Sequence, residues 1–335
     1  MDSGLILLAI VVILAVSFDF INGFHDTANA IATVIATRVL KPWQAILMAG
    51  GLNFLGALTG TAVAATVGKG ILDPAEVTQP IVMAALTGAI CWNLLTWYYG
   101  IPSSSSHALV GGLVGAGIAA DGFSAPLWAT IGQKTVLPFV ASPLIGFAVA
   151  FIGMILVLNV FQRASRFSMG AIFGRAQLLS SAFMAYSHGG NDAQKTMGVI
   201  TLALVSYGAI SRETFQVPTW VIITCAVAMG LGTAAGGWRI IRTMGTKLTR
   251  LEPVRGFVAE TAAGTVIEIA SRLGFPLSTT HVIGSTILGV GSTRGASAVR
   301  WNVAGNIVTA WIITIPAAAT VAFVSYRILS FFGLR

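Results

Sequence analysis

The sequence has very little charge. Only 9% of its 335 residues are charged and 56% are hydrophobic, whereas charged residues make up about a quarter of a soluble domain. The deficit runs along the whole chain, which excludes a soluble globular domain and predicts an all-α polytopic membrane protein. In a soluble protein the net charge of +8 would suggest nucleic acid as a partner. Here membrane topology explains it, and we expect no nucleic-acid partner.

Cysteine is scarce, and a cleavable signal peptide is lacking. Cys91 and Cys225 lie in different apolar runs and match no metal or redox spacing. We expect both thiols to be buried and to form no disulfide. Asp2 stands where the basic region of a signal peptide is expected, and no small-residue cleavage site follows. We therefore expect the first span to be retained.

Hydrophobic runs of membrane-spanning length, about 20 residues, fill most of the chain. They lie at 4–40, 43–67, 81–99, 128–160, 177–207, 218–237, 254–272 and 301–333. Two shorter stretches, 102–120 and 276–292, begin with proline and hydroxyl residues, so we expect discontinuous or hairpin elements there. We expect the first and fifth runs to be broken near Gly23 and Gly189, because each carries a polar motif headed by glycine.

Basic residues are unevenly shared between the connections. We place the loop of Arg38 and Lys41 in the cytoplasm and count each Pro-Ser stretch as one net crossing. Twelve basic residues then fall on the cytoplasmic side and four on the other. This is the positive-inside bias of a membrane protein. It predicts a multi-pass protein of the inner (plasma) membrane with both termini outside.

The two halves of the chain carry the same motifs in the same order. Gly23 and Asp26 match Gly189 and Asp192 at an offset of 166 residues. The Pro-Ser stretch at 100–107 matches 274–281 at an offset of 174 residues, and each half has five crossings. An odd number of crossings turns the second half upside down relative to the first.

We therefore predict an inverted-topology repeat with broken helices and two Pro-Ser hairpin elements. The first repeat covers 1–161, a short cytoplasmic linker covers 162–175, and the second repeat covers 176–335. Such repeats are typical of secondary transporters, whose site lies near the midplane where the halves meet.

Each Pro-Ser stretch offers a candidate anion site at the start of a helix. Pro102 and Pro276 suit a first helical turn, and hydroxyl residues follow: Ser104, Ser105, Ser106 and Ser278, Thr279, Thr280. Unpaired backbone N–H groups and the helix dipole attract an oxyanion there. For one stretch alone, a purely structural role is as well supported as an anion site, because hydroxyls also cap helices and bond to backbone carbonyls. The matched pair favours a site that holds a tetrahedral anion.

Two acidic motifs lie inside spans, where a charge costs from about 2.5 to over 10 kcal/mol. Asp26 has His25 and Asn29 beside it, and Asp192 follows Asn191. Carboxylate and amide oxygens suit Na⁺, and a buried carboxylate can also take up a proton. The motifs therefore predict a site for a coupling ion.

Three more ionisable groups lie in the spans. Lys195 is one turn after Asp192, so it either pairs with that carboxylate or faces the anion directly, and the sequence leaves both open. Glu260 has no obvious partner and is a second candidate for ion coupling. Asp19 has no assigned role.

All four histidines of the chain fall in the polar motifs: His25, His107, His188 and His281. We expect them to orient the site or to carry protons. Their spacing matches no zinc pattern, and we predict no metal site and no cofactor.

With these motifs the chain resembles the inorganic phosphate transporter (PiT) family. The resemblance rests on 23–30, on 188–196 and on the two Pro-Ser blocks, and it covers essentially the whole chain. The family pattern has Asn where this chain has His25, a substitution similar to the bacterial low-affinity branch. The link between the halves is short, unlike the long loops of some members.

The resemblance implies a transporter that moves phosphate with Na⁺ or H⁺ and forms a homodimer. The hydroxyl residues 104–106 and 278–280, the two hydroxyl blocks, would bind phosphate. Four residues would serve the coupling ion or the anion: Asp26, Asn29, Asn191 and Asp192. The bacterial branch looks proton-coupled and able to carry phosphate together with a divalent metal. Imidazole is a poor Na⁺ ligand and a good proton carrier, so His25 argues against a sodium site.

Several other functions compete with import of phosphate by proton-driven alternating access. A Na⁺-coupled phosphate or sulfate permease is the nearest alternative, and a channel can also be lined by two repeats. An intramembrane hydrolase would need one asymmetric nucleophile site, whereas this chain doubles every element. It also lacks a glycine-flanked serine elbow and a His-Glu-x-x-His stretch. We therefore expect no enzyme.

Overall fold

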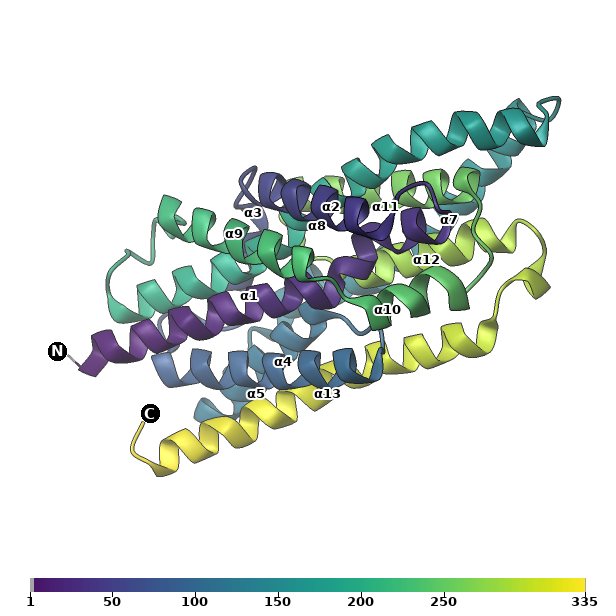
Figure 1. The fold of residues 1–335 in the computed structure, drawn as a ribbon. Coiled ribbons are helices and arrows are strands. Elements are labelled where there is room, and N and C mark those ends of the chain that lie inside the picture. Colours follow the sequence, from purple (N-terminus) through teal and green to yellow (C-terminus); the bar gives the residue numbers. More distant parts are fainter. Residues whose placement is uncertain (1–2, 335) are drawn as a thin grey trace.

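The computed structural model describes residues 3–334, and most of them are helical (Figure 1). No β-strand occurs among these residues beyond one isolated bridge between Leu72 and Pro126. The first half forms α1 (Ser3–Ala36), α2 (Pro42–Ala57), α3 (Ala62–Gly70), α4 (Gln79–Tyr99), α5 (Ser105–Asp121), α6 (Trp128–Ile131), the π-helical turn η1 (Gly132–Val136) and α7 (Leu137–Val160). The second half forms α8 (Arg166–Tyr207), α9 (Thr219–Ala235), α10 (Trp238–Arg242), the π-helical turn η2 (Thr243–Lys247), α11 (Pro253–Arg272), α12 (Thr279–Ser292), the 3₁₀ turn η3 (Ala296–Ala298) and α13 (Trp301–Phe331). The predicted all-α fold is confirmed.

Four of these helices are long and apolar enough to cross a membrane, or up to six if each bent helix pair is one span. Helices α8 and α11 are long, at 42 and 20 residues, yet they are not among the four. They carry the buried charged residues Asp192, Lys195 and Glu260. These polar side chains face the protein interior, whereas an average over composition does not distinguish buried polar residues from exposed ones.

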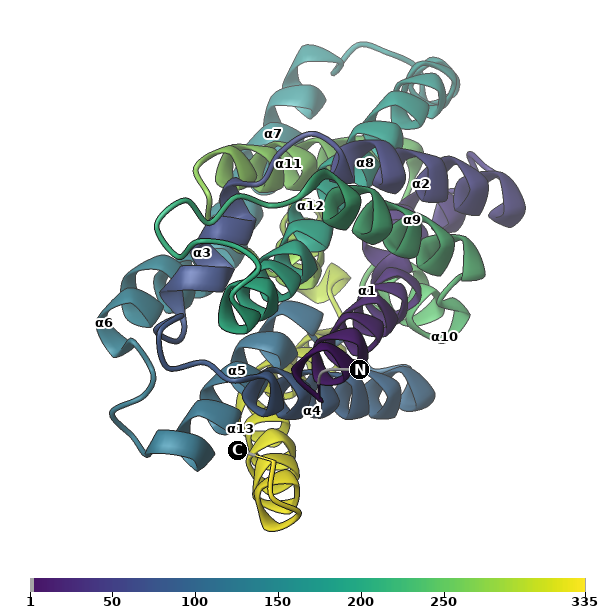
Figure 2. The ribbon, with the colours of Figure 1, turned by 90° about the vertical axis from the view of Figure 1, so that its left-hand side faces the viewer.

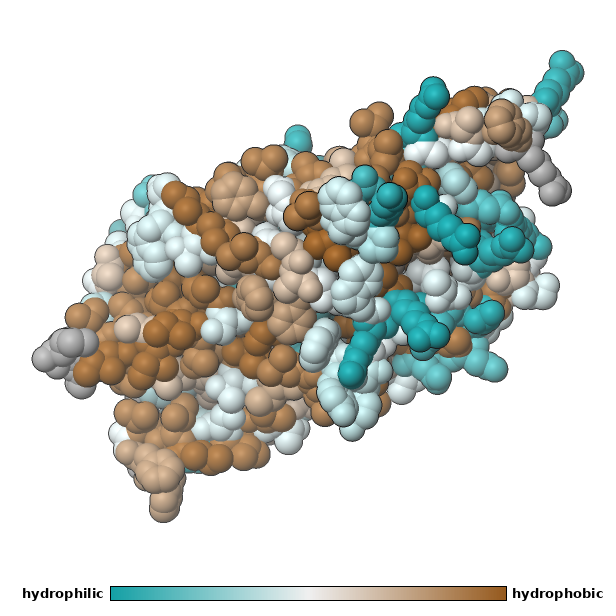
Figure 3. Space-filling view, in the orientation of Figure 1, coloured by the Kyte–Doolittle hydropathy of each residue, from teal (hydrophilic) through white to brown (hydrophobic). Residues whose placement is uncertain are grey.

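The surface agrees with a molecule that lies in a bilayer. Apolar side chains cover most of the visible face, and hydrophilic ones gather at one end (Figure 3). The two chain termini lie together at the opposite end (Figures 1 and 2).

The helices of the two halves follow one another in the same order. Each half has a long helix and a bent pair, then a helix, a Pro-Ser segment leading into another helix, and a long last helix. The bends are 71° between α2 and α3 and 61° between α9 and the segment 238–247. Helix α5 packs against α13, and α12 packs against α7. Each Pro-Ser helix therefore packs on the last helix of the other half, which brings both Pro-Ser segments to the centre.

The breaks that we expected near Gly23 and Gly189 are not present, because α1 and α8 run through both positions as continuous helices. These glycines serve close packing instead. A methyl group on Gly23 would lie 2.7 Å from the carbonyl oxygen of Met229 in α9, and one on Gly189 would meet the backbone of Asn53 in α2. The expectation of broken helices at these two glycines was wrong, since a glycine in an apolar run can equally mark a close helix crossing.

One expectation about the cysteines was also wrong. Cys225 is buried, but Cys91 is exposed, and both thiols are free. Helix α4 turns Cys91 outward, on the same side of the molecule as the exposed apolar residues Leu94 and Leu95. An apolar run does not show which of its faces is buried.

The contact at Gly189 predicts a large effect of a small substitution. Gly189→Ala places a methyl group against the Asn53 backbone, and overpacking of this kind costs about 1–3 kcal/mol. We expect a lower melting temperature in detergent and less monodisperse protein on size exclusion. Gly51→Ala in α2 is the control, because a methyl group there meets nothing within 4 Å. Equal melting of the two variants would contradict the close crossing.

Candidate functional site

The two Pro-Ser segments each run extended into the start of a helix. Ser104 and Ser278 are the N-caps of α5 and α12, and their hydroxyls accept hydrogen bonds from the backbone N–H groups of His107 (3.2 Å) and His281 (3.3 Å). Capping by serine is a common way to satisfy the free N–H groups of a helix start. For these two residues the structural role considered from the sequence is therefore present.

The two helix starts face one another at the centre of the molecule. Ser106 Oγ donates a hydrogen bond of 3.0 Å to the carbonyl oxygen of Leu277, and the rings of His107 and His281 lie 4.3 Å apart between centroids. Ser105 is buried, and its hydroxyl has no hydrogen-bond partner within residues 3–334. Two positive helix ends and a free hydroxyl are thus gathered in one buried place, which suits an oxyanion.

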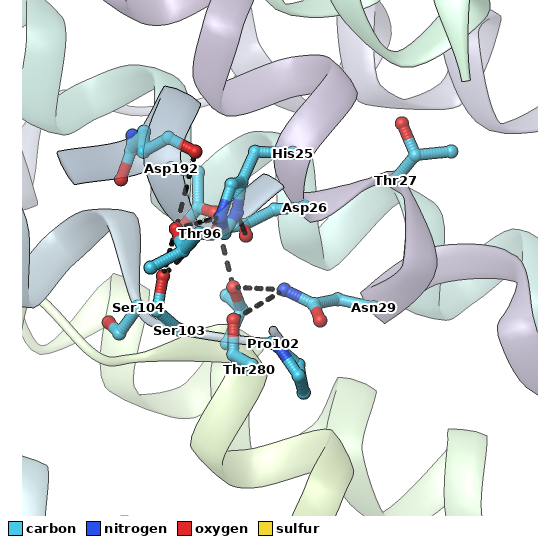
Figure 4. Close-up of polar contacts among 12 residues, drawn as sticks. His25, Asp26, Thr27, Asn29, Thr96, Pro102, Ser103, Ser104, Asp192 and Thr280 are labelled. Atoms are coloured by element: carbon cyan, nitrogen blue, oxygen red, sulfur yellow. Dashed lines mark hydrogen bonds and ion pairs between the residues drawn. The ribbon is translucent and has the colours of Figure 1, made fainter. Parts of the chain in front are cut away.

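Helix α1 brings the first acidic motif to this centre. His25 Nδ1 lies 2.7 Å from Asp26 Oδ1. Asn29 Nδ2 donates to the hydroxyls of Thr280 (2.9 Å) and Thr279 (3.2 Å). Figure 4 shows His25 and Asp26 on the same side as Asp192, with Asn29 reaching Thr280. The first half therefore contacts the hydroxyl block of the second half.

Helix α8 brings the second acidic motif to the same place. Lys195 Nζ donates to Asp192 Oδ1 (2.5 Å), to Ser106 Oγ (2.5 Å) and to the carbonyl oxygen of Leu277 (2.7 Å). The Thr279 hydroxyl donates to Asp192 Oδ2 at 3.1 Å. The expected pairing of Lys195 with Asp192 is therefore present, and the same ammonium group contacts Ser106 of the first Pro-Ser segment. That Lys195 faces the anion stays a prediction.

Asn191 lies beside this centre and contacts neither hydroxyl block in the described part of the chain. Its Nδ2 donates to Ser271 Oγ (2.8 Å) and to the carbonyl oxygen of Phe275 (3.4 Å). The Oδ1 atoms of Asn191 and Asn29 are buried and accept no hydrogen bond from residues 3–334. Both amide oxygens are therefore free to bind a cation.

Three ligand-type side chains converge between α1 and α8. One ligand atom each from Asp26, His188 and Asp192 lie within 4.8 Å of one another, and His188 Nε2 is 3.2 Å from Asp192 Oδ2. Two carboxylates and an imidazole can hold a cation or a proton. Because the spacing of the histidines matches no zinc pattern, we predicted from the sequence that there is no metal site. This group spans two helices and does not test that spacing, so the expectation stays a prediction.

Glu260 lies apart from this centre, in a polar group of its own. Its carboxylate accepts hydrogen bonds from Thr33 Oγ1 (2.5 Å), Ser180 Oγ (2.5 Å) and Gln177 Nε2 (3.0 Å). The sequence showed no partner because all three donors come from other helices, α1 and α8.

Two residues of the centre were missed from the sequence. Thr96 Oγ1 lies 3.0 Å from His25 Nε2, and Ser103 Oγ donates to Thr96 Oγ1 at 2.8 Å. Ser103 stands directly before the hydroxyl block, which was a usable signal. Thr96 gave none, because a single threonine in an apolar span usually bonds to its own helix.

An all-helical, apolar molecule with buried ionisable groups and paired helix starts at its centre has the features of a membrane transport protein. The phosphate transporter family model matches residues 22–322. The chain belongs to this family, and the resemblance seen in its motifs is confirmed.

Relatives of known family agree. A protein of Rhizobium meliloti (strain 1021), named a probable low-affinity inorganic phosphate transporter, is 50% identical over 97% of this chain and 98% of its own length. A protein of the same name from Bacillus subtilis (strain 168) is 46% identical over 98% of this chain and 99% of its own. A solved structure, "The sodium-dependent phosphate transporter", matches with a TM-score of 0.89 at 27% identity, covering 97% of this chain and 99% of that one. These relatives are transporters, a role other than catalysis.

Proposed function

We propose that this protein imports inorganic phosphate across the plasma membrane and binds it where the two Pro-Ser helix starts meet. The observation that carries the proposal is the contact of Lys195 Nζ with Ser106 Oγ (2.5 Å), beside the unpartnered hydroxyl of Ser105. An ammonium group, a free hydroxyl and helix N-termini are donors of the kind that phosphate oxygens need. Ser104, Ser278, Thr279 and Thr280 complete the binding region.

We propose that a proton gradient drives the import. His25 and Asp26 are in contact within a buried cluster, and Glu260 lies in a second one. These groups take up and release protons, while Asn29 links the first cluster to the hydroxyl block. Phosphate also carries a proton that Asp26 or Asp192 can accept, which favours phosphate over sulfate as the substrate.

A Na⁺-coupled transporter is the second candidate. It is supported by the grouped ligand atoms of Asp26, His188 and Asp192 and by the free Oδ1 atoms of Asn29 and Asn191. It is also supported by the likeness to a sodium-dependent phosphate transporter. The same ligands support a third version, in which phosphate enters with a divalent metal.

The wider proposal follows the order of the helices. Residues 1–161 and 176–335 form an inverted-topology repeat, joined by the linker 162–175, and the transporter works by alternating access. Both termini lie outside, the protein is a homodimer, and it needs no resident cofactor.

The test is uptake of labelled phosphate into proteoliposomes, under a pH gradient or a Na⁺ gradient alone, with Asp26→Asn alongside. We expect the pH gradient to drive accumulation of phosphate that excess sulfate does not reduce. Asp26→Asn should lower this accumulation at least tenfold. The reason is that this substitution removes an ionisable group next to the anion site.

Other outcomes would change the proposal in defined ways. Accumulation that needs Na⁺ would select the second candidate. Uptake that only equilibrates under every gradient would indicate a channel. Displacement of labelled phosphate by sulfate would change the substrate.

A further inference from the structure

Asp19 is a buried carboxylate to which neither the sequence nor the proposed phosphate site gives a role. It lies in α1 with 0% of its surface exposed. Its Oδ1 accepts a hydrogen bond of 2.8 Å from Thr196 Oγ1 in α8. Its Oδ2 accepts none within residues 3–334, and the thiol of Cys225, a weak donor, faces it from α9.

Asp19 has no basic partner of its own. The charged groups that face it are Asp192 and Lys195, both in α8. Lys195 has three N–H donors, and Asp192, Ser106 and Leu277 already take them. An ionised Asp19 would therefore be an uncompensated charge inside the membrane, next to a second carboxylate. Such a residue is expensive to keep and points to a function.

The position of Asp19 relates it to the other polar groups of α1. Asp19, Asp26 and Thr33 follow one another at intervals of seven residues, close to two helical turns, so they lie along one face of α1. Their partners come from α8 in reverse order, Thr196 for Asp19 and Asp192 near Asp26. The partners of Glu260, which accepts the hydrogen bond of Thr33, continue this seam with Ser180 and Gln177.

This polar seam between α1 and α8 runs through most of the membrane. Fourteen residues of helix rise about 21 Å, against about 30 Å for the hydrocarbon core. Ionisable groups occur at three levels: Asp19 at one end, Asp26 with Asp192 in the middle, and Glu260 at the other end. The phosphate site is at the middle level, so Asp19 and Glu260 flank it.

We propose that Asp19 is a proton-binding group of the transport cycle, on the side of the phosphate site opposite Glu260. Its free oxygen takes a proton from water on one side of the membrane and releases it to water on the other side once per cycle, so that the carboxylate ends as it began. With the N-terminus outside, Asp19 is the group on the outer side. This inference rests on the proposed proton-driven import of phosphate.

The experiment separates coupling from phosphate binding. Proteoliposomes with the wild type, Asp19→Asn, Asp19→Glu or Thr201→Val are assayed for exchange of internal for external phosphate at equal pH, and for accumulation under a pH gradient. We expect Asp19→Asn to keep exchange within about threefold of the wild type but to lose accumulation. Asp19→Glu, which keeps a carboxylate, should restore at least part of it.

Thr201→Val is the matched control, because Thr201 is buried in the same helix as Thr196 and, among the described residues, its hydroxyl bonds to Met197 of its own helix alone. It should keep both activities. Accumulation by Asp19→Asn equal to the wild type would overturn the proposal, as would loss of exchange together with accumulation, which indicates a structural role. If the wild type itself accumulates phosphate only with Na⁺, the proton-driven function fails first, and the role of Asp19 fails with it.

Discussion

Replacement of Lys195 by methionine is expected to abolish phosphate accumulation and to lower the free energy of unfolding by about 3–5 kcal/mol. The ammonium group is buried and bonds to Asp192, to Ser106 and to the carbonyl oxygen of Leu277. Its removal leaves the Asp192 carboxylate buried without its cation. It also removes the one basic side chain that contacts a hydroxyl block among the described hydrogen bonds. The measurements are thermal melting in detergent and phosphate exchange in proteoliposomes.

The two effects of Lys195→Met can be separated with a second substitution. Asp192→Asn combined with Lys195→Met removes both charges, and removing a whole buried pair is often nearly neutral for stability. We expect the double variant to recover most of the melting temperature while its phosphate exchange stays at least 100-fold below the wild type. Lys134→Met, at an exposed position, is the control for loss of a lysine. Recovery of exchange in the double variant would mean that Lys195 serves only to neutralise Asp192.

Ser105→Ala is expected to raise the KM for phosphate by about 10- to 100-fold with little change in stability. The Ser105 hydroxyl is buried and makes no hydrogen bond within the described residues, so its loss leaves no protein group unpaired. A hydrogen bond to a charged group contributes about 1.5–3 kcal/mol, and each 1.4 kcal/mol is about a factor of ten. The measurement is the concentration dependence of initial uptake.

The neighbouring serine provides the contrast for Ser105→Ala. Ser104 caps α5 through its bond with the N–H of His107, and loss of an N-cap costs about 1 kcal/mol. Ser104→Ala should therefore melt earlier and change the KM less than Ser105→Ala does. The reverse order of the two KM values would place the phosphate contact on the capping residue and contradict the assignment of Ser105.

The sequence was informative where a motif contains a charged residue whose burial in a membrane costs free energy. A carboxylate such as Asp26 or Asp192 in an apolar run is rare enough to indicate a candidate site without any structure. The facing of the two Pro-Ser segments followed from their occurrence in matched positions, and the structure places Ser106 against Leu277 at 3.0 Å. In both cases the motifs themselves, without knowledge of their spatial neighbours, were sufficient for the prediction.

Contacts between helices could not be predicted in the same way. The partners of Glu260 come from α1 and α8, and no spacing within one segment reveals them. The contact of Lys195 with Ser106, which lies on a distant helix, could not be predicted either, whereas its pairing with Asp192 one turn away could. Gly189 was interpreted as a break because the sequence does not show which neighbour the glycine approaches.

The close contacts of α2 with α8 have a further consequence for motion. At Gly56 a methyl group would meet the backbone of Tyr186, and at Gly189 it would meet that of Asn53. Where two backbones touch there are no long side chains to repack, and closely packed interfaces change in discrete steps rather than by gradual sliding. Helices α2 and α8 are therefore joined as one rigid body. Helix α3, beyond the bend of 71° that follows α2, belongs to the same body, because a methyl group on Gly198 of α8 would lie 2.5 Å from the carbonyl oxygen of Ala64 in α3. The bent pair and α8 therefore move as one unit in any conformational change.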